Sequence, residues 1–403
     1  MKLFHSLLVA PATLGLLAPL SANATEVNLN EISNYSDVES IEFANSFNND
    51  ESNLNPLLAG GEGLIDDHSH DGGFSETTTA SFSADFYIGS EDTSATETST
   101  GLATDNDLDD SIMAGYSFQI DLNTSFTGED SLDISLDAGN SAVAGIEEFD
   151  GNGGGDKLAV DGVAYTFPVG GATVFVGDNS DGSSLFTTAC VYGGPSNTLD
   201  DCANVNAGIT GGEIAAGASY DFGNGFTVAT GMQTSQTVLT EESLDGIALN
   251  AAYTGEDFGV SLTYSSVETS TTEEDTATAF NAYYTPEGLP SISVGYETVD
   301  IGGAAASVDE KESVFLGLTW DEVGAGSLGV AVGYSNIVES SDEEFQYEAY
   351  YEYPVNDGMT ITPLVFVKEN ATAGSDDTTG AMVKTSFSSV SYTHLTLPTN
   401  REV

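Results

Sequence analysis

The sequence predicts an all-β protein, a transmembrane, antiparallel, up-and-down β-barrel of about 16 strands. Apolar and polar side chains alternate in many segments, each near the about 9 to 11 residues that a tilted strand needs to cross a bilayer. Short and long connections alternate between these segments, and aromatic side chains cluster beside the short turns. Together these features place the apolar flank of each strand against lipid and its polar flank around water.

The first 24 residues predict a secretory signal peptide. Lys2 precedes an apolar run that is short for a membrane-spanning helix, and Ala22, Asn23 and Ala24 form a small-residue cleavage pattern, so we expect cleavage after Ala24. An uncleaved anchor is the alternative. No later segment approaches about 18 continuous apolar residues, which excludes a helical membrane protein. Residues 25–73 are predicted to be an acidic linker, with a short helix capped by Ser36 or Asp37.

The charge balance is strongly acidic. The chain has 64 Asp and Glu against 6 Lys and Arg, a formal net charge of −58. Such a chain repels nucleic acid and attracts cations, so we expect no nucleic-acid partner. A content of 17 Tyr, 20 Phe and 40% hydrophobic residues argues against disorder.

The strands are predicted from period-two alternation within residues 74–388. In ASFSADFYIG, Phe82 and Phe86 share one flank and Asp85 lies on the other. The same pattern places Asp121, Glu348 and Glu352 on the lumen side. The predicted strands are 80–89, 114–123, 131–139, 163–169, 172–178, 214–222, 225–233, 246–253, 257–266, 277–284, 291–297, 313–320, 327–335, 344–355, 359–368 and 380–387.

The connections sort into two classes, as an up-and-down barrel requires. PVGG, FGNG, TPEGLP and PVNDG are short turns, whereas SEDTSATETSTGLATDNDLDD and VESSDEE are long and acidic. Outward-facing aromatic residues near the short turns predict an interfacial girdle. Its members are Phe222, Phe226, Tyr253, Phe258, Tyr284, Trp320 and Tyr353. The alternative is a secreted or surface-layer β-protein whose strands bury their apolar faces against each other and whose acids bind calcium.

Cys190 and Cys202 lie close together in a chain that looks exported, which predicts a local disulfide rather than a zinc site. DDHSHD, residues 66–71, is read as a polar linker without a metal, and DGNGGGD, residues 150–156, as a turn. No His falls within a predicted strand and no nucleophile, base and orienting group come together, so neither catalysis nor a cofactor is expected.

Several segments carry a resemblance to a known family. LLAGGEGL, DDHSHD, AGYSFQIDLNTSFTGEDSL, VAYTFPVGGATVFVGD and LFTTACVYGGPSNTLDDC are similar to segments of cyanobacterial outer-membrane porins of the iron-uptake and carbohydrate-selective type. The resemblance covers most of residues 55–388. It implies a passive outer-membrane channel for small hydrophilic solutes and inorganic ions, with iron among the candidates, and a homotrimer in lipid.

The resemblance also implies that the third long loop folds into the lumen. The candidate constriction residues there are Tyr192, Asp200 and Asp201, and the alternative is a disulfide-tied surface loop. Acids that line a pore select cations, so we expect cation preference. Two departures from the family are expected: residues 25–73 are too short for a complete surface-layer-homology domain, and SVSYTHLTLPTNREV, residues 389–403, breaks the pattern and is interpreted as a non-native tail.

Overall fold

The computed structural model describes residues 78–92, 111–141, 146–149, 151–211, 213–235, 245–270, 273–303, 309–338, 343–370 and 377–389. The predicted signal peptide, the acidic linker with its expected helix, and the chain beyond Ser389 lie outside these residues. No helix in the described ranges has both the length and the apolar character needed to cross a membrane.

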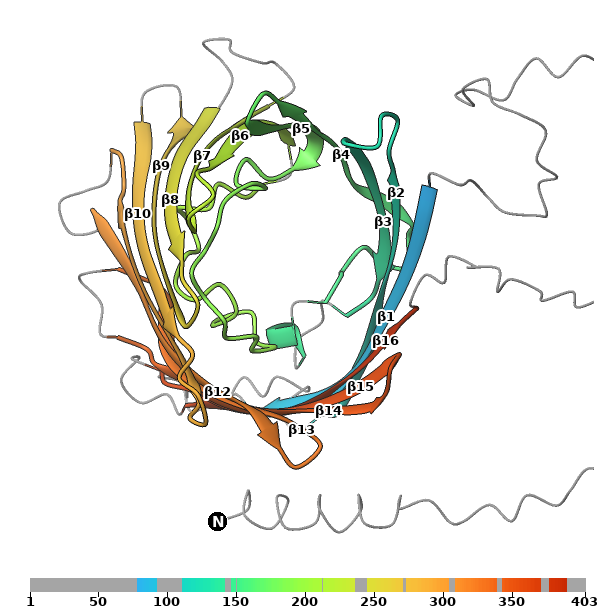
Figure 1. Cartoon of the computed structure of the whole chain (residues 1–403). Coiled ribbons are helices and arrows are strands. Elements are labelled where there is room, and N and C mark those ends of the chain that lie inside the picture. Colours follow the sequence, from blue (N-terminus) through green and yellow to red (C-terminus); the bar gives the residue numbers. More distant parts are fainter. Residues whose placement is uncertain are drawn as a thin grey trace, which may run out of the picture. The chain divides into compact units, whose positions relative to one another are not determined.

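Sixteen strands form one closed antiparallel barrel, as predicted. Each strand pairs with its neighbours in sequence, and β1 closes the ring by pairing with β16 (Figure 1). The strands are β1 Thr78–Asp92, β2 Met113–Thr124, β3 Ser131–Gly139, β4 Ala159–Val169, β5 Ala172–Ser180, β6 Glu213–Asp221, β7 Phe226–Thr234, β8 Asp245–Thr254, β9 Phe258–Ser270, β10 Glu273–Tyr284, β11 Ser291–Asp300, β12 Glu310–Val323, β13 Gly326–Val338, β14 Gln346–Asn356, β15 Met359–Lys368 and β16 Thr378–Ser388.

Several strands continue beyond their predicted apolar sections. β1 reaches Asp92 and β12 begins at Glu310, both toward long connections, and β9 reaches Ser270, so that only residues 271–272 separate it from β10. Backbone pairing between adjacent strands does not need apolar side chains, so a ladder continues where the alternation has already ended. At the other end of the barrel, the hairpin turn FGNG joins β6 to β7. Its Gly223 and Gly225 have φ of 76° and 84°, a left-handed conformation that a side chain would disfavour.

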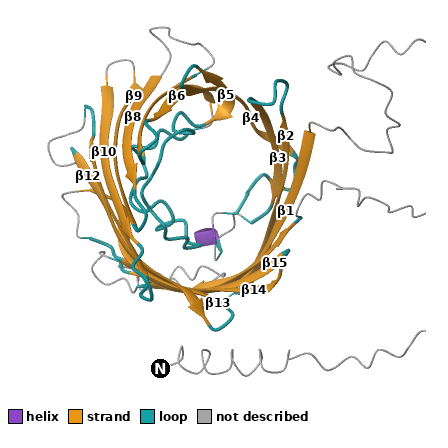
Figure 2. Ribbon diagram, viewed as in Figure 1, coloured by secondary structure: helices purple, strands orange, loops and turns teal. Residues whose placement is uncertain are grey.

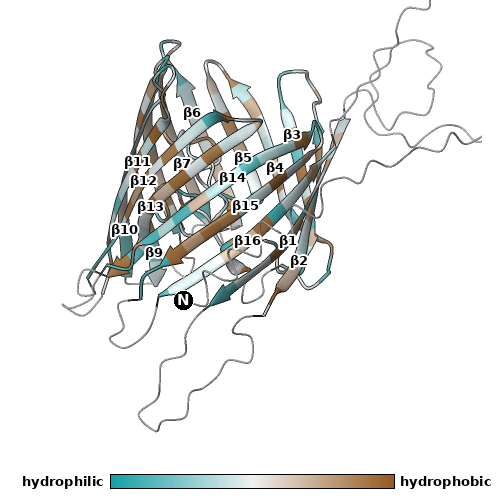
Figure 3. Cartoon of the chain, turned by 90° about the horizontal axis from the view of Figure 1, so that it is seen from below, coloured by the Kyte–Doolittle hydropathy of each residue, from teal (hydrophilic) through white to brown (hydrophobic). Residues whose placement is uncertain are grey.

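The barrel has its apolar side chains outside and its polar side chains inside. On β9, Val260, Leu262 and Tyr264 are 37%, 52% and 46% exposed. Ser261 and Thr263, which alternate with them, are 2% and 0% exposed. Figure 3 shows the alternation as brown and pale or teal bands along the strands. Because a single sheet closes on itself and leaves no edge strand, the alternative of two sheets packed face to face is wrong.

Two connections turn into the barrel (Figures 1 and 2). The long inward segment, residues 181–211, joins β5 to β6. The short inward segment comprises the described residues 140–141, 146–149 and 151–158 between β3 and β4, and it contains the 3-10 helix η3, Glu147–Phe149. The third-loop prediction is confirmed for the long inward segment. The short inward segment was not expected, because DGNGGGD was interpreted as a plain turn.

Candidate functional site: a lumen narrowed by two inward segments

The long inward segment is cross-linked by the predicted disulfide. Cys190 and Cys202 are bonded, with 6.5 Å between their Cα atoms. The carbonyl oxygen of Cys202 accepts a hydrogen bond of 2.7 Å from Asn281 Nδ2 on β10. A Cβ at Gly295 on β11 would lie 1.7 Å from that oxygen. A glycine in the strand therefore lets the loop backbone come into contact with the wall.

Inward side chains of β8, β9 and β11 hold the first half of the long inward segment. Three alternate backbone N–H groups of the segment each donate to a polar side chain of the wall, so this part runs extended across the strands. The pairs are Thr187 N to Asn250 Oδ1 (3.1 Å), Ala189 N to Ser261 Oγ (2.9 Å) and Val191 N to Ser293 Oγ (3.0 Å). These strand side chains satisfy loop backbone groups that water would otherwise bind.

Glu297 on β11 holds the second half of the same segment. Its carboxylate is fully buried and accepts from Asn206 N at 2.8 Å, Ala207 N at 2.7 Å and Asn206 Nδ2 at 2.7 Å. A buried carboxylate is tolerated only when it is well hydrogen-bonded, and here three donors surround it. Glu297 therefore positions the loop and is no part of an open ion path.

Glu348 on β14 binds the segment at its middle. The hydroxyl of Tyr192 donates to Glu348 Oε1 at 2.6 Å, and Ser196 Oγ donates to Oε2. The Tyr192 ring also packs against the rings of Phe315 and Tyr350, with centroids 5.2 and 5.7 Å away. Burial, assisted by the Glu348 carboxylate, raises the pKa of the Tyr192 phenol far above its ordinary value. Tyr192 thus stays a neutral donor.

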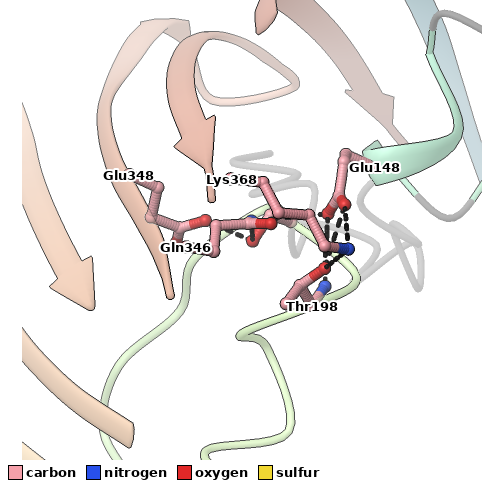
Figure 4. Close-up of polar contacts among 6 residues, drawn as sticks. Glu148, Thr198, Gln346, Glu348 and Lys368 are labelled. Carbon is pink, nitrogen blue, oxygen red and sulfur yellow. Dashed lines mark hydrogen bonds and ion pairs between the residues drawn. The ribbon is translucent and has the colours of Figure 1, made fainter. Parts of the chain in front are cut away.

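The short inward segment meets the long one at Glu148, whose side chain contacts Thr198, Gln346 and Lys368; we call these four residues the junction (Figure 4). Glu148 accepts from Thr198 Oγ1 at 2.9 Å and from Thr198 N at 3.3 Å. Lys368 Nζ on β15 lies 3.6 Å from Glu148 Oε1, and Gln346 Nε2 on β14 lies 3.4 Å from Oε2. The junction ties both segments to the β14–β15 wall.

An apolar core lies inside the barrel where the two segments cover β12–β16. It consists of buried side chains from the wall and from both segments: Tyr87, Ile146, Phe149, Tyr192, Leu199, Cys202, Ala203, Phe315, Ala331, Tyr350, Leu364, Phe366 and Met382. β15 contributes Leu364 and Phe366 inward, while Val365 and Val367 on its other flank are exposed. The prediction of a wet lumen is therefore wrong on this side, because both flanks of β15 are apolar.

The wall formed by β1–β4 is different. Ser81 and Ser83 face inward from β1 and are exposed. The pairing register places Asp121 of β2 opposite Ser81, so this carboxylate faces inward as well. It accepts from Gln119 Nε2 at 2.7 Å and from Ser135 Oγ at 2.8 Å. These donors are uncharged, so they orient the carboxylate without neutralising it.

The structure separates the predicted lumen residues into two groups. Asp85 and Asp121 are inward and half-buried, on the β1–β4 wall, and Glu352 is inward and exposed near the short-turn end of β14. Glu348 is also inward, but only 5% of it is exposed because the long inward segment covers it. Tyr192 is buried beside it rather than lining open space.

The side chains of the remaining predicted residues are exposed or half-buried. Asp200 and Asp201 are exposed on the long inward segment, in a turn next to Cys202. The predicted girdle residues lie on the outward flank or in the short turns. Phe222, Tyr284 and Tyr353 are exposed, and Tyr253 and Trp320 are half-buried.

Sequence reasoning missed Glu148 and Glu297, which organise the two inward segments. Their partners are 50 and 91 residues away in the chain, so no local pattern connects them. One signal was present: β15 reads MTITPLVFVK, apolar on both flanks, which indicates that something covers its inner face.

No family model matches the chain, and no curated protein matches its sequence. Solved structures do match. An engineered variant of the porin from Rhodobacter blastica has a TM-score of 0.53 and 13% identity, covering 77% of this chain and 100% of that one. Another variant of the same porin gives the same values. The chain has a porin fold.

A second kind of porin supports the same assignment. The high-pH structure of OprB from Pseudomonas putida has a TM-score of 0.54 and 12% identity, covering 78% of this chain and 94% of that one. Identities this low speak to the fold alone. Membership of the cyanobacterial iron-uptake and carbohydrate-selective family therefore stays a prediction.

Proposed function

We propose that this chain is an outer-membrane channel through which small hydrophilic solutes and inorganic ions diffuse passively. One observation carries the proposal: a closed barrel exposes large apolar side chains outside and keeps polar side chains inside, with an inward wall on β1–β4 that neither segment fully covers. Lipid accepts the first surface and water the second. The porin fold supports the same reading.

We further propose that the channel prefers cations. The formal net charge is −58, and the inward aspartates of β1–β4 have uncharged hydrogen-bond donors. Negative groups along a pore raise the local concentration of cations and repel anions. Export by a signal peptide cleaved after Ala24, an outer-membrane location, assembly as a homotrimer and iron among the permeating ions belong to the same proposal.

Planar-bilayer recording tests the proposal directly. Detergent-purified protein should insert and give discrete conductance steps, and its reversal potential under a KCl gradient should have the sign expected for K⁺ selectivity. Absence of any steps, with heat-modifiable gel migration confirming a folded barrel, would contradict the channel. Steps with a Cl⁻-selective reversal potential would contradict the cation preference alone.

A further inference from the structure

Chemically identical inward side chains differ in exposure from one side of the barrel to the other. Ser81 and Ser83 on β1 face inward and are exposed. Ser261 on β9 and Ser293 on β11 also face inward, yet each is only 2% exposed. The difference comes from the long inward segment, whose backbone donates to both of the buried hydroxyls.

Covered positions continue around the barrel from β8 to β15. Polar inward residues bind the long inward segment on β8–β11 and β14, and the apolar core fills the space beside β12–β16. Water and ions are excluded from close-packed apolar contacts. Where the long inward segment and the apolar core cover it, the inward flank of β8–β15 is therefore not in contact with a permeating ion, whereas Glu352 near the short-turn end of β14 stays exposed.

The short inward segment covers only part of the opposite wall. Asn152 N donates to Ser117 Oγ at 2.7 Å, and Phe149 packs on Tyr87 with ring centroids 5.4 Å apart, so the parts of β1 and β2 nearest the long connections are covered. Toward the short turns, Ser83 and Asn123 remain exposed and Asp121 half-exposed. This stretch is the uncovered part of the wall.

The uncovered wall carries carboxylates without a base beside them. Asp133 on β3 accepts from Asn123 Nδ2 at 2.5 Å and from Ser131 Oγ at 2.8 Å, and Asp121 likewise has neutral donors. The described bases lie on other elements: Lys157 on the short inward segment, Lys311 on β12, Lys368 on β15 and Lys384 on β16, where it pairs with Tyr87 of β1. Of these, Lys368 is within 3.6 Å of Glu148.

We propose that ions cross this barrel along the uncovered wall of β1–β3, and that Asp121 and Asp133 on that wall set its charge selectivity. The inference rests on the proposed channel function and adds the route and the selecting residues. The hydrogen-bond donors of Asp121 and Asp133 are neutral groups, whereas Glu297 and Glu348 are buried beneath the long inward segment. Asp200 and Asp201, the residues that the sequence pointed to, are then secondary to the wall.

Thiol modification tests the route. The chain has two cysteines and both form the disulfide, so one introduced cysteine is the sole free thiol. Ser83→Cys and Gln119→Cys place it on the uncovered wall, and Ser261→Cys and Ser293→Cys place it on the covered wall. Each variant is recorded before and after a positively charged methanethiosulfonate reagent. We expect a stepwise loss of K⁺ current for the first pair and none for the second.

The outcomes separate the route from the function. If unmodified protein conducts but Ser261→Cys and Ser293→Cys lose current as Ser83→Cys does, the route is wrong and the channel stands. If Ser83→Cys and Gln119→Cys both keep their current while mass spectrometry confirms modification, the route is also wrong. If folded protein gives no conductance at all, both the function and the route fail.

Charge removal tests the selecting residues. Asp121→Asn and Asp133→Asn, singly and together, are compared with Glu352→Gln, which removes an inward, exposed carboxylate from β14. We expect the K⁺-to-Cl⁻ permeability ratio to fall in the aspartate variants, most in the double variant, and to change less in Glu352→Gln. An equal or larger fall in Glu352→Gln would overturn the assignment to β1–β3.

Discussion

Cys202 and Ala203 are the two residues whose backbone shows how tightly the long inward segment is held. Their φ angles are 53° and 54°, in the left-handed region that costs non-glycine residues about 1–3 kcal/mol. Such a conformation persists only where its surroundings determine it. Here Asn281 binds the Cys202 carbonyl and Gly295 leaves room for it.

Gly295→Ala should loosen the long inward segment. The added Cβ would lie 1.7 Å from the Cys202 carbonyl oxygen, and overpacking of this kind costs about 1–3 kcal/mol. We expect larger open-channel current fluctuations than in the unaltered protein, measured in planar bilayers. Gly193→Ala on the same segment is the control, because its Cβ would meet nothing within 4 Å. Equal fluctuations in both variants would contradict this account of Gly295.

Among the elements, the turn between β2 and β3 is closed by one carboxylate. Asp130 accepts from Phe126 N at 2.9 Å, Thr127 N at 2.8 Å and Ser125 Oγ at 2.7 Å. Tyr165 of β4 also donates to it, at 2.5 Å. The Tyr165 hydrogen bond, with those of the turn, holds the pKa of Asp130 well below its usual range.

The stabilisation by Asp130 should therefore depend on pH. A carboxyl whose pKa is lower in the folded state stabilises that state above its unfolded pKa, about 4, and loses this as the pH falls toward the folded pKa. Asp130→Asn should lower the thermal midpoint in detergent at pH 7, and the difference should shrink below about pH 4. Asp257→Asn, an exposed turn residue, should show no such trend. A pH-independent difference for Asp130→Asn would contradict the assignment.

The junction joins the two inward segments mainly through hydrogen bonds. Glu148→Ala removes the acceptor for Thr198 N and Oγ1, and a hydrogen bond to a charged group contributes about 1.5–3 kcal/mol. Lys368→Met removes an ion pair whose lysine is 40% exposed, worth about 0–1 kcal/mol, and a long hydrogen bond of 3.4 Å from Lys368 Nζ to Thr198 Oγ1. We expect clearly noisier single-channel currents for Glu148→Ala than for Lys368→Met. The reverse order would mean that the ion pair dominates.

The strands were predictable from the alternation of side chains, and the infolding of the long inward segment from the family resemblance. The contacts that hold the inward segments were not predictable, for a physical reason. In a strand between lipid and water, apolar and polar side chains alternate at every second residue, so the pattern becomes clearer as the strand becomes longer. Glu148, Glu297 and Glu348 each bind residues remote in the chain. Of the three, only Glu348 was predicted to face the lumen, and it was expected in an open one. Only the two-sided apolar character of β15 indicated a covered inner face.

At the scale of the whole molecule, acidic charge is the dominant electrostatic feature. If the uncovered wall and the exposed loop acids act at a distance through water, salt should screen them, since the Debye length falls from about 10 Å at 0.1 M to about 3 Å at 1 M. We expect the K⁺-to-Cl⁻ permeability ratio to move toward unity as the mean KCl concentration rises over this range. A ratio that does not change with salt would point to direct ion coordination instead.

Two kinds of interaction hold the molecule together, and they respond differently to cooling: hydrogen bonds between the strands and apolar packing in the core inside the barrel. Strand pairing within lipid rests on hydrogen bonds that have no competing solvent, whereas the seating of Phe149, Tyr192 and Phe366 depends on the expulsion of water, which weakens on cooling. Cooling should therefore loosen the two inward segments before it disturbs the barrel strands. We therefore expect the current through the proposed channel to fluctuate more in the cold, while the strand pairing of the barrel stays intact.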